Sequence, residues 1–99
     1  SAKVVNAAAN VTLSADGQTF QSGRIAIGAV APTPLYVEAA GAALAGQPVN
    51  EATIAKACAA AQAAAVPITD MRGTIEQRKH LVGVLVKRVV NTAVARARG

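Results

Sequence analysis

Apolar and polar residues alternate along the first part of the chain, from Lys3 to Leu13. One face of an extended backbone there carries Val5, Ala7, Ala9, Val11 and Leu13, and the other carries Asn6, Asn10 and Thr12. A period of two is typical of a strand with one covered face. Asp16-Gly17 follows, and this dipeptide is among the strongest hairpin signals. We therefore expect an antiparallel hairpin with strands over about 3–13 and 18–30.

The second of these strands has Ile25, Ile27 and Ala29 as its inward positions. Ser22-Gly23 can divide it into two short strands, and a third strand is expected beside the hairpin. Gly28 indicates either a bulge or a close approach of another backbone. It does not belong to a phosphate-binding loop, because the glycine spacing and the following Lys-Ser/Thr of such a loop are missing.

Helices are expected after Pro32-Thr33-Pro34, which ends the sheet because proline cannot donate a hydrogen bond to a strand ladder. The expected helices span about 34–45, 51–65 and 74–98. Thr33 is the expected N-cap of the first helix, and Gly46 its stop. Asn50 caps the second helix. Thr74-Ile75-Glu76-Gln77 forms a capping box that opens the third.

Helical spacing of apolar residues defines the face that each of the two longer helices buries. In the second helix this face carries Ile54, Cys58, Ala61 and Ala65. In the third it carries Leu81, Val82, Leu85, Val86, Val89 and Ala93, roughly opposite Glu76, His80, Lys87, Asn91 and Arg98. The predicted fold is α+β with two layers, a small antiparallel sheet of two to three strands followed by three helices, in a single domain over residues 1–99.

The third helix is long for a chain of this size. At 1.5 Å per residue it measures about 35 Å, whereas a compact domain of 99 residues has a diameter of about 26 Å. We therefore expect its basic end to extend beyond the sheet.

Composition limits what the core can be made of. The chain is 53% hydrophobic but only 2% aromatic, so alanine, valine, leucine and isoleucine must fill the core. Charged residues make up only 15%, which indicates a surface partly covered by partner domains or subunits. No apolar run approaches the ~20 residues of a membrane span, and the N-terminus lacks a signal-peptide layout. We expect a cytoplasmic protein.

Reactive side chains are few and scattered. His80 is the only histidine, Cys58 the only cysteine, and there are five acidic residues. A hydrolytic triad needs a nucleophile, a base and an orienting group, and a metal site needs clustered ligands. We therefore assign no catalytic, cofactor-binding or metal-binding residue. His80 is expected to be exposed or partly packed, and Cys58 to be a small core residue.

Positive charge is concentrated in the C-terminal third. From Met71 onward the chain holds seven of its ten basic residues and one of its five acidic residues. A solvated helix whose charge complements the helix dipole explains this pattern. Docking to an acidic protein is the next interpretation. Nucleic-acid binding is the least favoured, because the third helix has no aromatic residue to stack on bases. Its basic side chains are Arg78, Lys79, Lys87, Arg88, Arg96 and Arg98.

The stretch from Arg24 to Pro34, Arg-Ile-Ala-Ile-Gly-Ala-Val-Ala-Pro-Thr-Pro, resembles a recurrent segment of one family. The family comprises the flavoprotein (medium) subunits of molybdenum hydroxylases, such as carbon monoxide dehydrogenase and xanthine dehydrogenase. Three later segments follow the same pattern: Ala42–Gly46, Thr69–Arg72 and Arg78–Leu81. Two positions depart from the pattern: relatives usually have Gly or Asn where this chain has Ala29, and Tyr where it has Gln77.

This resemblance implies the C-terminal domain of a subunit that binds FAD, in an enzyme that passes electrons from a molybdenum cofactor through iron–sulfur clusters to the flavin. It implies that the main FAD-binding motifs lie in preceding domains of the same subunit, and that iron–sulfur and molybdenum subunits are partners. The motif residues, which we expect to be structural, are Arg24, Gly28, Pro32, Asp70, Arg72 and Arg78. Asp70 is expected to pair with Arg78. The alternative is a free-standing basic adaptor that binds an acidic protein or nucleic acid.

Overall fold

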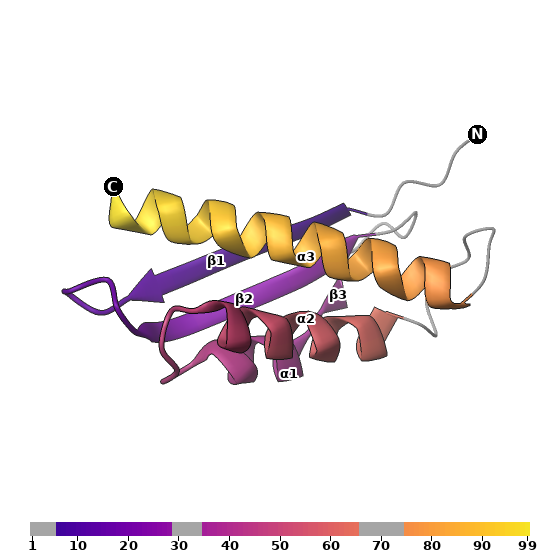
Figure 1. Ribbon diagram of the computed structural model, residues 1–99, viewed down its shortest axis with the longest axis horizontal. Coiled ribbons are helices and arrows are strands. Elements are labelled where there is room, and N and C mark those ends of the chain that lie inside the picture. Colours follow the sequence, from indigo (N-terminus) through magenta and orange to yellow (C-terminus); the bar gives the residue numbers. More distant parts are fainter. Residues whose placement is uncertain (1–5, 29–34, 66–74) are drawn as a thin grey trace.

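The computed structural model describes residues 6–28, 35–65 and 75–99, and it shows a small sheet packed against helices (Figure 1). The strands are β1 (Asn6–Leu13), β2 (Phe20–Gly28) and β3 (Leu35–Tyr36). The helices are α1 (Glu38–Leu44), α2 (Glu51–Ala65) and α3 (Ile75–Arg98). The predicted α+β class, with the sheet preceding the helices, is confirmed.

The strands lie in the order β1-β2-β3, and both neighbouring pairs are antiparallel. β1 is therefore an edge strand. Ala7 stands opposite Ile27, and Ala9 opposite Ile25, so these four residues share one face. Ala7 and Ala9 are half-buried while Ala8 between them is exposed. The alternation predicted for the first strand is confirmed.

The second strand is not divided at Ser22-Gly23, because β2 runs without interruption through both residues. The irregularity in register lies between Thr12 and Leu13, next to the hairpin turn. Gly28 pairs regularly with Asn6, which excludes the bulge considered at that glycine. Ala29, the third inward candidate of this strand, lies outside the described residues.

The hairpin turn is closed by hydrogen bonds around Asp16. Its carboxylate oxygen Oδ1 accepts from the Ser14 hydroxyl at 2.6 Å and from the Gln18 N–H at 3.0 Å. These donors lower the pKa of Asp16, the Ser14 hydroxyl contributing most. Gly17 has φ +71°, a left-handed conformation that glycine adopts without steric cost. The second strand therefore begins only at Phe20, after this turn.

The first helix begins later than the sequence predicts. Val37 is extended, with φ −96° and ψ 93°, and its N–H donates to the Ile25 carbonyl at 2.9 Å. The chain is thus still paired with the sheet where a helix over about 34–45 was expected, and α1 starts only at Glu38. No side chain caps it. Thr33, the expected cap, lies outside the described residues.

Two glycines set how closely α1 approaches β2. A Cβ atom at Gly41 would lie 2.5 Å from the Gly23 carbonyl oxygen. A Cβ atom at Gly23 would lie 2.6 Å from Leu44 Cδ1. Because no real Cβ comes so near, both positions require glycine for this spacing. α1 therefore packs on the same face of the sheet as the inward residues of β1.

The second helix follows the prediction. Asn50 Oδ1 accepts the Thr53 N–H at 2.9 Å, as expected of an N-cap. Ile54, Cys58 and Ala61 are buried, and Ala57 joins them with no exposed surface.

The buried face of α3 is shifted from the predicted stripe. The most deeply buried row is Val82, Val86, Val90 and Val94. The second row, Leu81, Leu85, Val89 and Ala93, is only half-buried. The prediction included both rows but left out Val90 and Val94, because it followed the row that lies towards the edge of the sheet. His80, Lys87, Asn91 and Arg98 are exposed, as expected of the opposite face.

The molecule is elongated, with extents of 43 × 22 × 18 Å. The comparison with a spherical diameter was therefore misleading, and the basic end of α3 does not extend beyond the sheet. Instead, Arg98 Nη2 and Nε donate to the Gly17 carbonyl in the hairpin turn, at 2.7 and 3.2 Å. The largest fully buried side chains of the core are Phe20, Ile25, Ile27, Leu44, Val82, Val86 and Val90. None of the described helices combines the length and the apolarity that a membrane crossing requires.

Candidate functional site

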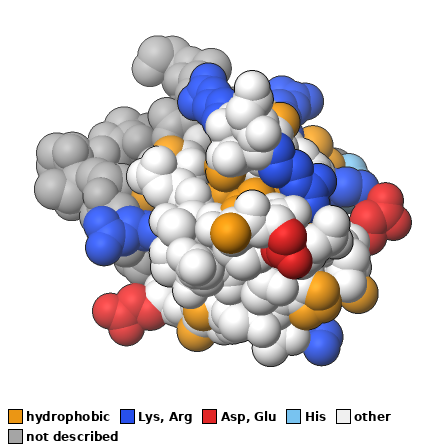
Figure 2. Space-filling model, turned by 90° about the vertical axis from the view of Figure 1, so that its left-hand side faces the viewer, with side chains coloured by type: hydrophobic (Ala, Val, Ile, Leu, Met, Phe, Trp, Pro, Cys, Tyr) orange, Lys and Arg blue, Asp and Glu red, His pale blue; other side chains and the backbone are white. Residues whose placement is uncertain are grey.

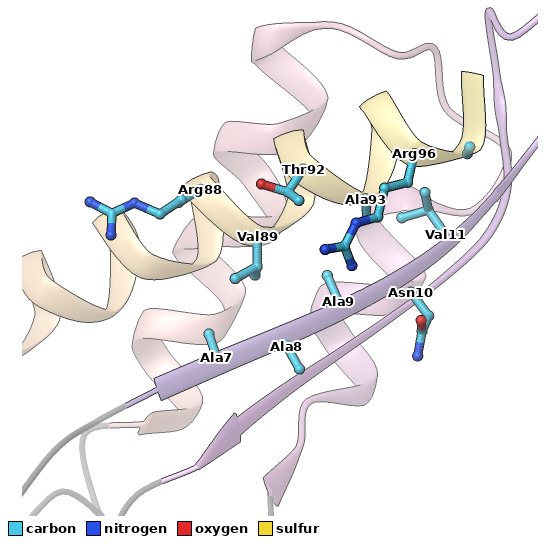
Figure 3. A pocket seen from close by; sticks show the side chains of 11 residues that line it. Ala7, Ala8, Ala9, Asn10, Val11, Arg88, Val89, Thr92, Ala93 and Arg96 are labelled. Atoms are coloured by element: carbon cyan, nitrogen blue, oxygen red, sulfur yellow. The ribbon is translucent and has the colours of Figure 1, made fainter. Parts of the chain in front are cut away.

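A groove runs between β1 and α3 along the edge of the sheet (Figure 3). Its volume is about 560 Å³. β1 and α3 line it together, with Ala7, Ala8, Ala9, Asn10, Val11, Arg88, Val89, Thr92, Ala93, Arg96 and Ala97. Five of these eleven residues are alanine, whose short side chains leave space between the two elements.

The α3 wall has a polar rim above an apolar strip. Arg88, Thr92 and Arg96 repeat every four residues and so lie on one side of the helix. Figure 3 shows Val89 pointing from α3 towards β1, and the Arg96 guanidinium extending towards β1 beside Ala9. The groove therefore combines an apolar lining with positive charge along one margin.

The backbone of the neighbouring strand shows which polar groups of β1 are unpaired. The Val37 N–H donates to the Ile25 carbonyl, so the polar backbone groups of Ile25 point towards β3. In an antiparallel sheet these groups point alternately to the two sides of a strand. Those of Ala26 must therefore point towards β1, where Ala26 stands opposite Ala8.

The same alternation applies along β1. Ala8 exchanges its hydrogen bonds with β2, and the N–H and C=O groups of Ala7, Ala9 and Val11 point away from β2. Among the described residues, none pairs with these groups outside the sheet. The free edge of β1 is thus a row of donors and acceptors that forms one wall of the groove.

The charge around the groove is one-sided. Arg88 and Arg96 are exposed, and neither makes an ion pair with the described part of the chain. Among the residues that the structure describes, no acidic one lines the groove. Figure 2, which views the molecule from the end that carries the C-terminus, shows basic side chains gathered mainly in the upper half, where α3 lies.

The motif residues expected from the sequence are not brought together in this groove. Arg24 is exposed on β2 and lines a separate pocket of about 500 Å³ beside α1. Gly28 is the last residue of β2. Arg78 belongs to α3, but its side chain is not described, and the other three candidates, Pro32, Asp70 and Arg72, lie outside the described residues. The expected pair of Asp70 with Arg78 therefore stays a prediction.

The two potentially reactive side chains lie apart from the groove. Cys58 is 9% exposed, and burial raises the pKa of its thiol, opposed by the charge of Lys87. It is the small core residue that the sequence predicts, and as a buried thiol it is a poor nucleophile. His80 is exposed on α3, also as predicted. Within residues 6–28, 35–65 and 75–99, no three His, Cys, Asp or Glu residues lie close enough to hold a metal ion.

The cofactors that the resemblance implies do not fit the described residues. An iron–sulfur cluster requires several cysteine ligands, whereas Cys58 is the single cysteine. Seven of the eleven lining residues of the groove are alanine or valine, and the described lining offers neither an aromatic platform nor a glycine-rich phosphate loop for a flavin nucleotide. We therefore derive no chemical step through either cofactor. The arrangement of an open backbone edge, small apolar side chains and two guanidinium groups suits a binding surface.

Sequence reasoning named Arg88 and Arg96 among the basic residues but did not find the groove. The signal was present in two parts, the run Ala7-Ala8-Ala9 in the first strand and the four-residue spacing of Arg88 and Arg96. Only the packing of α3 along β1 joins these parts.

The comparison with known proteins gives a consistent result. The family described as "CO dehydrogenase flavoprotein C-terminal domain" matches residues 2–93. The carbon monoxide dehydrogenase medium chain of Afipia carboxidovorans is 39% identical over 92 residues, which cover 93% of this chain and 32% of that protein. The chain thus spans about a third of the length of this relative.

Solved structures show the same fold. A Cu,Mo-CO dehydrogenase, in its cyanide-inactivated form, matches with a TM-score of 0.76 and 32% identity, over 97% of this chain and 37% of the other. Quinoline 2-oxidoreductase from Pseudomonas putida 86 matches with a TM-score of 0.79 and 30% identity, over 94% and 32%. The chain belongs to the CO dehydrogenase flavoprotein C-terminal domain family.

Proposed function

We propose that this chain is the C-terminal structural and interaction domain of the FAD-binding subunit of a molybdenum hydroxylase-type oxidoreductase. In such an enzyme electrons pass from a molybdenum centre through iron–sulfur clusters to FAD. The observation that carries the proposal is the family match over residues 2–93, together with the fold shared with a Cu,Mo-CO dehydrogenase at 32% identity.

In the proposed enzyme, this domain covers the flavin-binding domains of its own subunit and contacts the other subunits. The preceding domains of the subunit hold the flavin, and this domain packs against them and against the iron–sulfur and molybdenum subunits. The motif residues Arg24, Gly28, Pro32, Asp70, Arg72 and Arg78 then maintain its shape. The described surface supports this role, because the groove between β1 and α3 has the features of a binding surface and its described lining contains no His, Cys, Asp or Glu. We place the enzyme in the cytoplasm.

The test is to purify the full polypeptide that contains this sequence from its own host, through an affinity tag. The expected result is a complex that contains FAD, iron and molybdenum, in which an oxidisable substrate bleaches the flavin absorbance. A polypeptide that purifies alone, without flavin or metals, contradicts the proposal. In parallel, the 99-residue chain is titrated with FAD, and tight saturable binding would overturn the assignment of the flavin site to other domains.

The alternative of a free-standing basic adaptor rests on the charge of α3 alone. None of the reported relatives is an adaptor, and each is or belongs to an oxidoreductase by its name. The purification distinguishes the two, because an adaptor would be isolated with an acidic protein or nucleic acid and without flavin.

A further inference from the structure

We propose that the groove between β1 and α3 binds an extended acidic segment of a partner polypeptide, which joins β1 as an additional strand. The geometry of the groove alone leads to this binding mode, which does not depend on the oxidoreductase assignment.

The free edge of β1 has the features of a strand that accepts another. It is eight residues long, against a mean of about 5–6 for strands. Edges that stay exposed are usually protected by proline, charged residues or bulges. From Asn6 to Thr12, β1 has no proline and no charged residue, and its irregularity comes only after Thr12. The strand at the other edge of the sheet, β3, is only two residues long.

The groove has room for a strand at the correct place. A neighbouring strand lies about 4.7–4.9 Å from its partner. The unpaired backbone groups of Ala7, Ala9 and Val11 open into the groove, and Ala93 and Ala97 stand opposite on α3. These alanines leave the space that the alternate side chains of an added strand need. Such a segment would pair with β1 on one side and pack small apolar side chains under α3.

The charge and spacing of the rim identify the segment as acidic. Arg88 and Arg96 are eight residues apart on α3, so their Cα atoms are separated by about 12 Å. In an extended strand, residues four positions apart lie on the same side and about 13–14 Å apart. Two carboxylates at positions i and i+4 of the added strand therefore match the two guanidinium groups.

Other occupants fit less well. A second copy of this chain carries a net charge of +5 and would bring a second pair of arginines to the first. A nucleic acid supplies phosphates, but the edge of β1 alternates N–H donors with C=O acceptors, and the acceptors repel phosphate. A polypeptide backbone supplies both kinds of partner in the required order.

The experiment uses the 99-residue chain, labelled with ¹⁵N, and a capped seven-residue peptide of alternating Thr and Val with Glu at its second and sixth positions. NMR titration should show saturable shifts at Ala7, Ala9 and Val11, and their amide hydrogens should exchange more slowly when the peptide is bound. The amide of Ala8, which already pairs with β2, should change much less in exchange rate. Absence of protection at Ala7 and Ala9 overturns the proposal.

Controls separate backbone pairing from simple charge attraction. The same peptide N-methylated at its β1-facing residues keeps its charge but cannot pair, and it should lose binding. The double variant Arg88→Gln/Arg96→Gln should weaken binding about 2- to 30-fold, as two exposed ion pairs allow. Lys56→Gln/Lys79→Gln, which removes two exposed charges outside the groove lining, should leave it unchanged.

Three outcomes contradict the proposal. Equal binding of the N-methylated peptide shows that only charge is involved. A single-stranded oligonucleotide that protects the same amides more tightly than the peptide identifies a nucleic-acid surface. Protection of Ala7 and Ala9 that rises with protein concentration, without peptide, identifies an interface between two copies of this chain.

Discussion

The close approach of α1 to β2 at Gly41 predicts that a single methyl group there destabilises the protein. The Cβ of a Gly41→Ala variant would lie 2.5 Å from the Gly23 carbonyl oxygen, 3.4 Å from Gly23 C and 3.8 Å from Arg24 Cα. All three atoms belong to the backbone of β2, where Gly23 and Arg24 are paired with Val11 and Asn10 of β1. α1 must therefore move away from the sheet, because β2 cannot yield.

The magnitude follows from two opposing terms. Alanine gains about 1 kcal/mol over glycine inside a helix. Overpacking a core typically costs about 1–3 kcal/mol, and the upper part of that range applies here, since the obstacle is backbone. We expect a net loss of about 1–2 kcal/mol in the free energy of unfolding. For a domain of this size that lowers the Tm by about 4–16 °C.

Gly83→Ala is the matched control. Its Cβ would meet Gln62 Nε2 first, which is the end of a flexible side chain that donates to the Lys79 carbonyl at 2.8 Å. Loss of this exposed hydrogen bond costs about 0.5–1.5 kcal/mol, and the helix gains about 1 kcal/mol. Urea denaturation followed by circular dichroism should place this variant within about 0.5 kcal/mol of the wild type. A Gly41→Ala protein as stable as Gly83→Ala would refute the reasoning about the close approach.

Three further predictions concern the ends of the molecule and its core. Arg98→Ala should lower the free energy of unfolding by about 0.5–1 kcal/mol, because it removes two exposed hydrogen bonds to the Gly17 carbonyl; a variant as stable as the wild type in urea denaturation contradicts this. The pKa of Asp16 is lowered from 3.8, so its stabilising contribution is present above that pH and lost as the pH falls through the folded-state pKa. Thermal melts of wild type and Asp16→Asn should therefore differ near neutral pH and converge in acid, and a difference independent of pH would count against the carboxylate. Cys58 should react with a thiol reagent only as fast as the protein opens, since burial shields it and raises its pKa; labelling at the rate of a free thiol in native buffer would contradict its burial.

Local patterns were sufficient for much of the fold. The two-residue period of β1, the Asp16-Gly17 turn and the Asn50 cap each depend on neighbours within a few residues, and each was predicted correctly. The start of α1 was not, because the hydrogen bond from Val37 to Ile25 that delays the helix joins residues twelve positions apart. Strands, turns and caps that depend on neighbouring residues can be predicted from the sequence. A hydrogen bond from a distant strand that delays a helix cannot.

The binding surface shows the same division. The charge of Arg88 and Arg96 is visible in the sequence, and so is the row of small residues in β1. Their meeting depends on which side of α3 lies over the strand. That side is set by the buried row Val82, Val86, Val90 and Val94, of which the predicted stripe contained only the first two. Successive positions on a helix differ by about 100°, so the choice of buried row decides whether the arginines border the groove.

The packing of α3 along β1 has a consequence for the order in which the fold can form. The helix that covers the first strand, α3, follows all the other described elements in the sequence, and the contact from Arg98 to Gly17 joins residues 81 positions apart. During synthesis, the inward face of β1 stays uncovered until α3 has emerged, whereas α1 can already pack on β2. Contacts of such separation slow folding because a long loop has to close first. A nascent chain stalled before Val82 should therefore still expose the apolar side of β1 to chaperones.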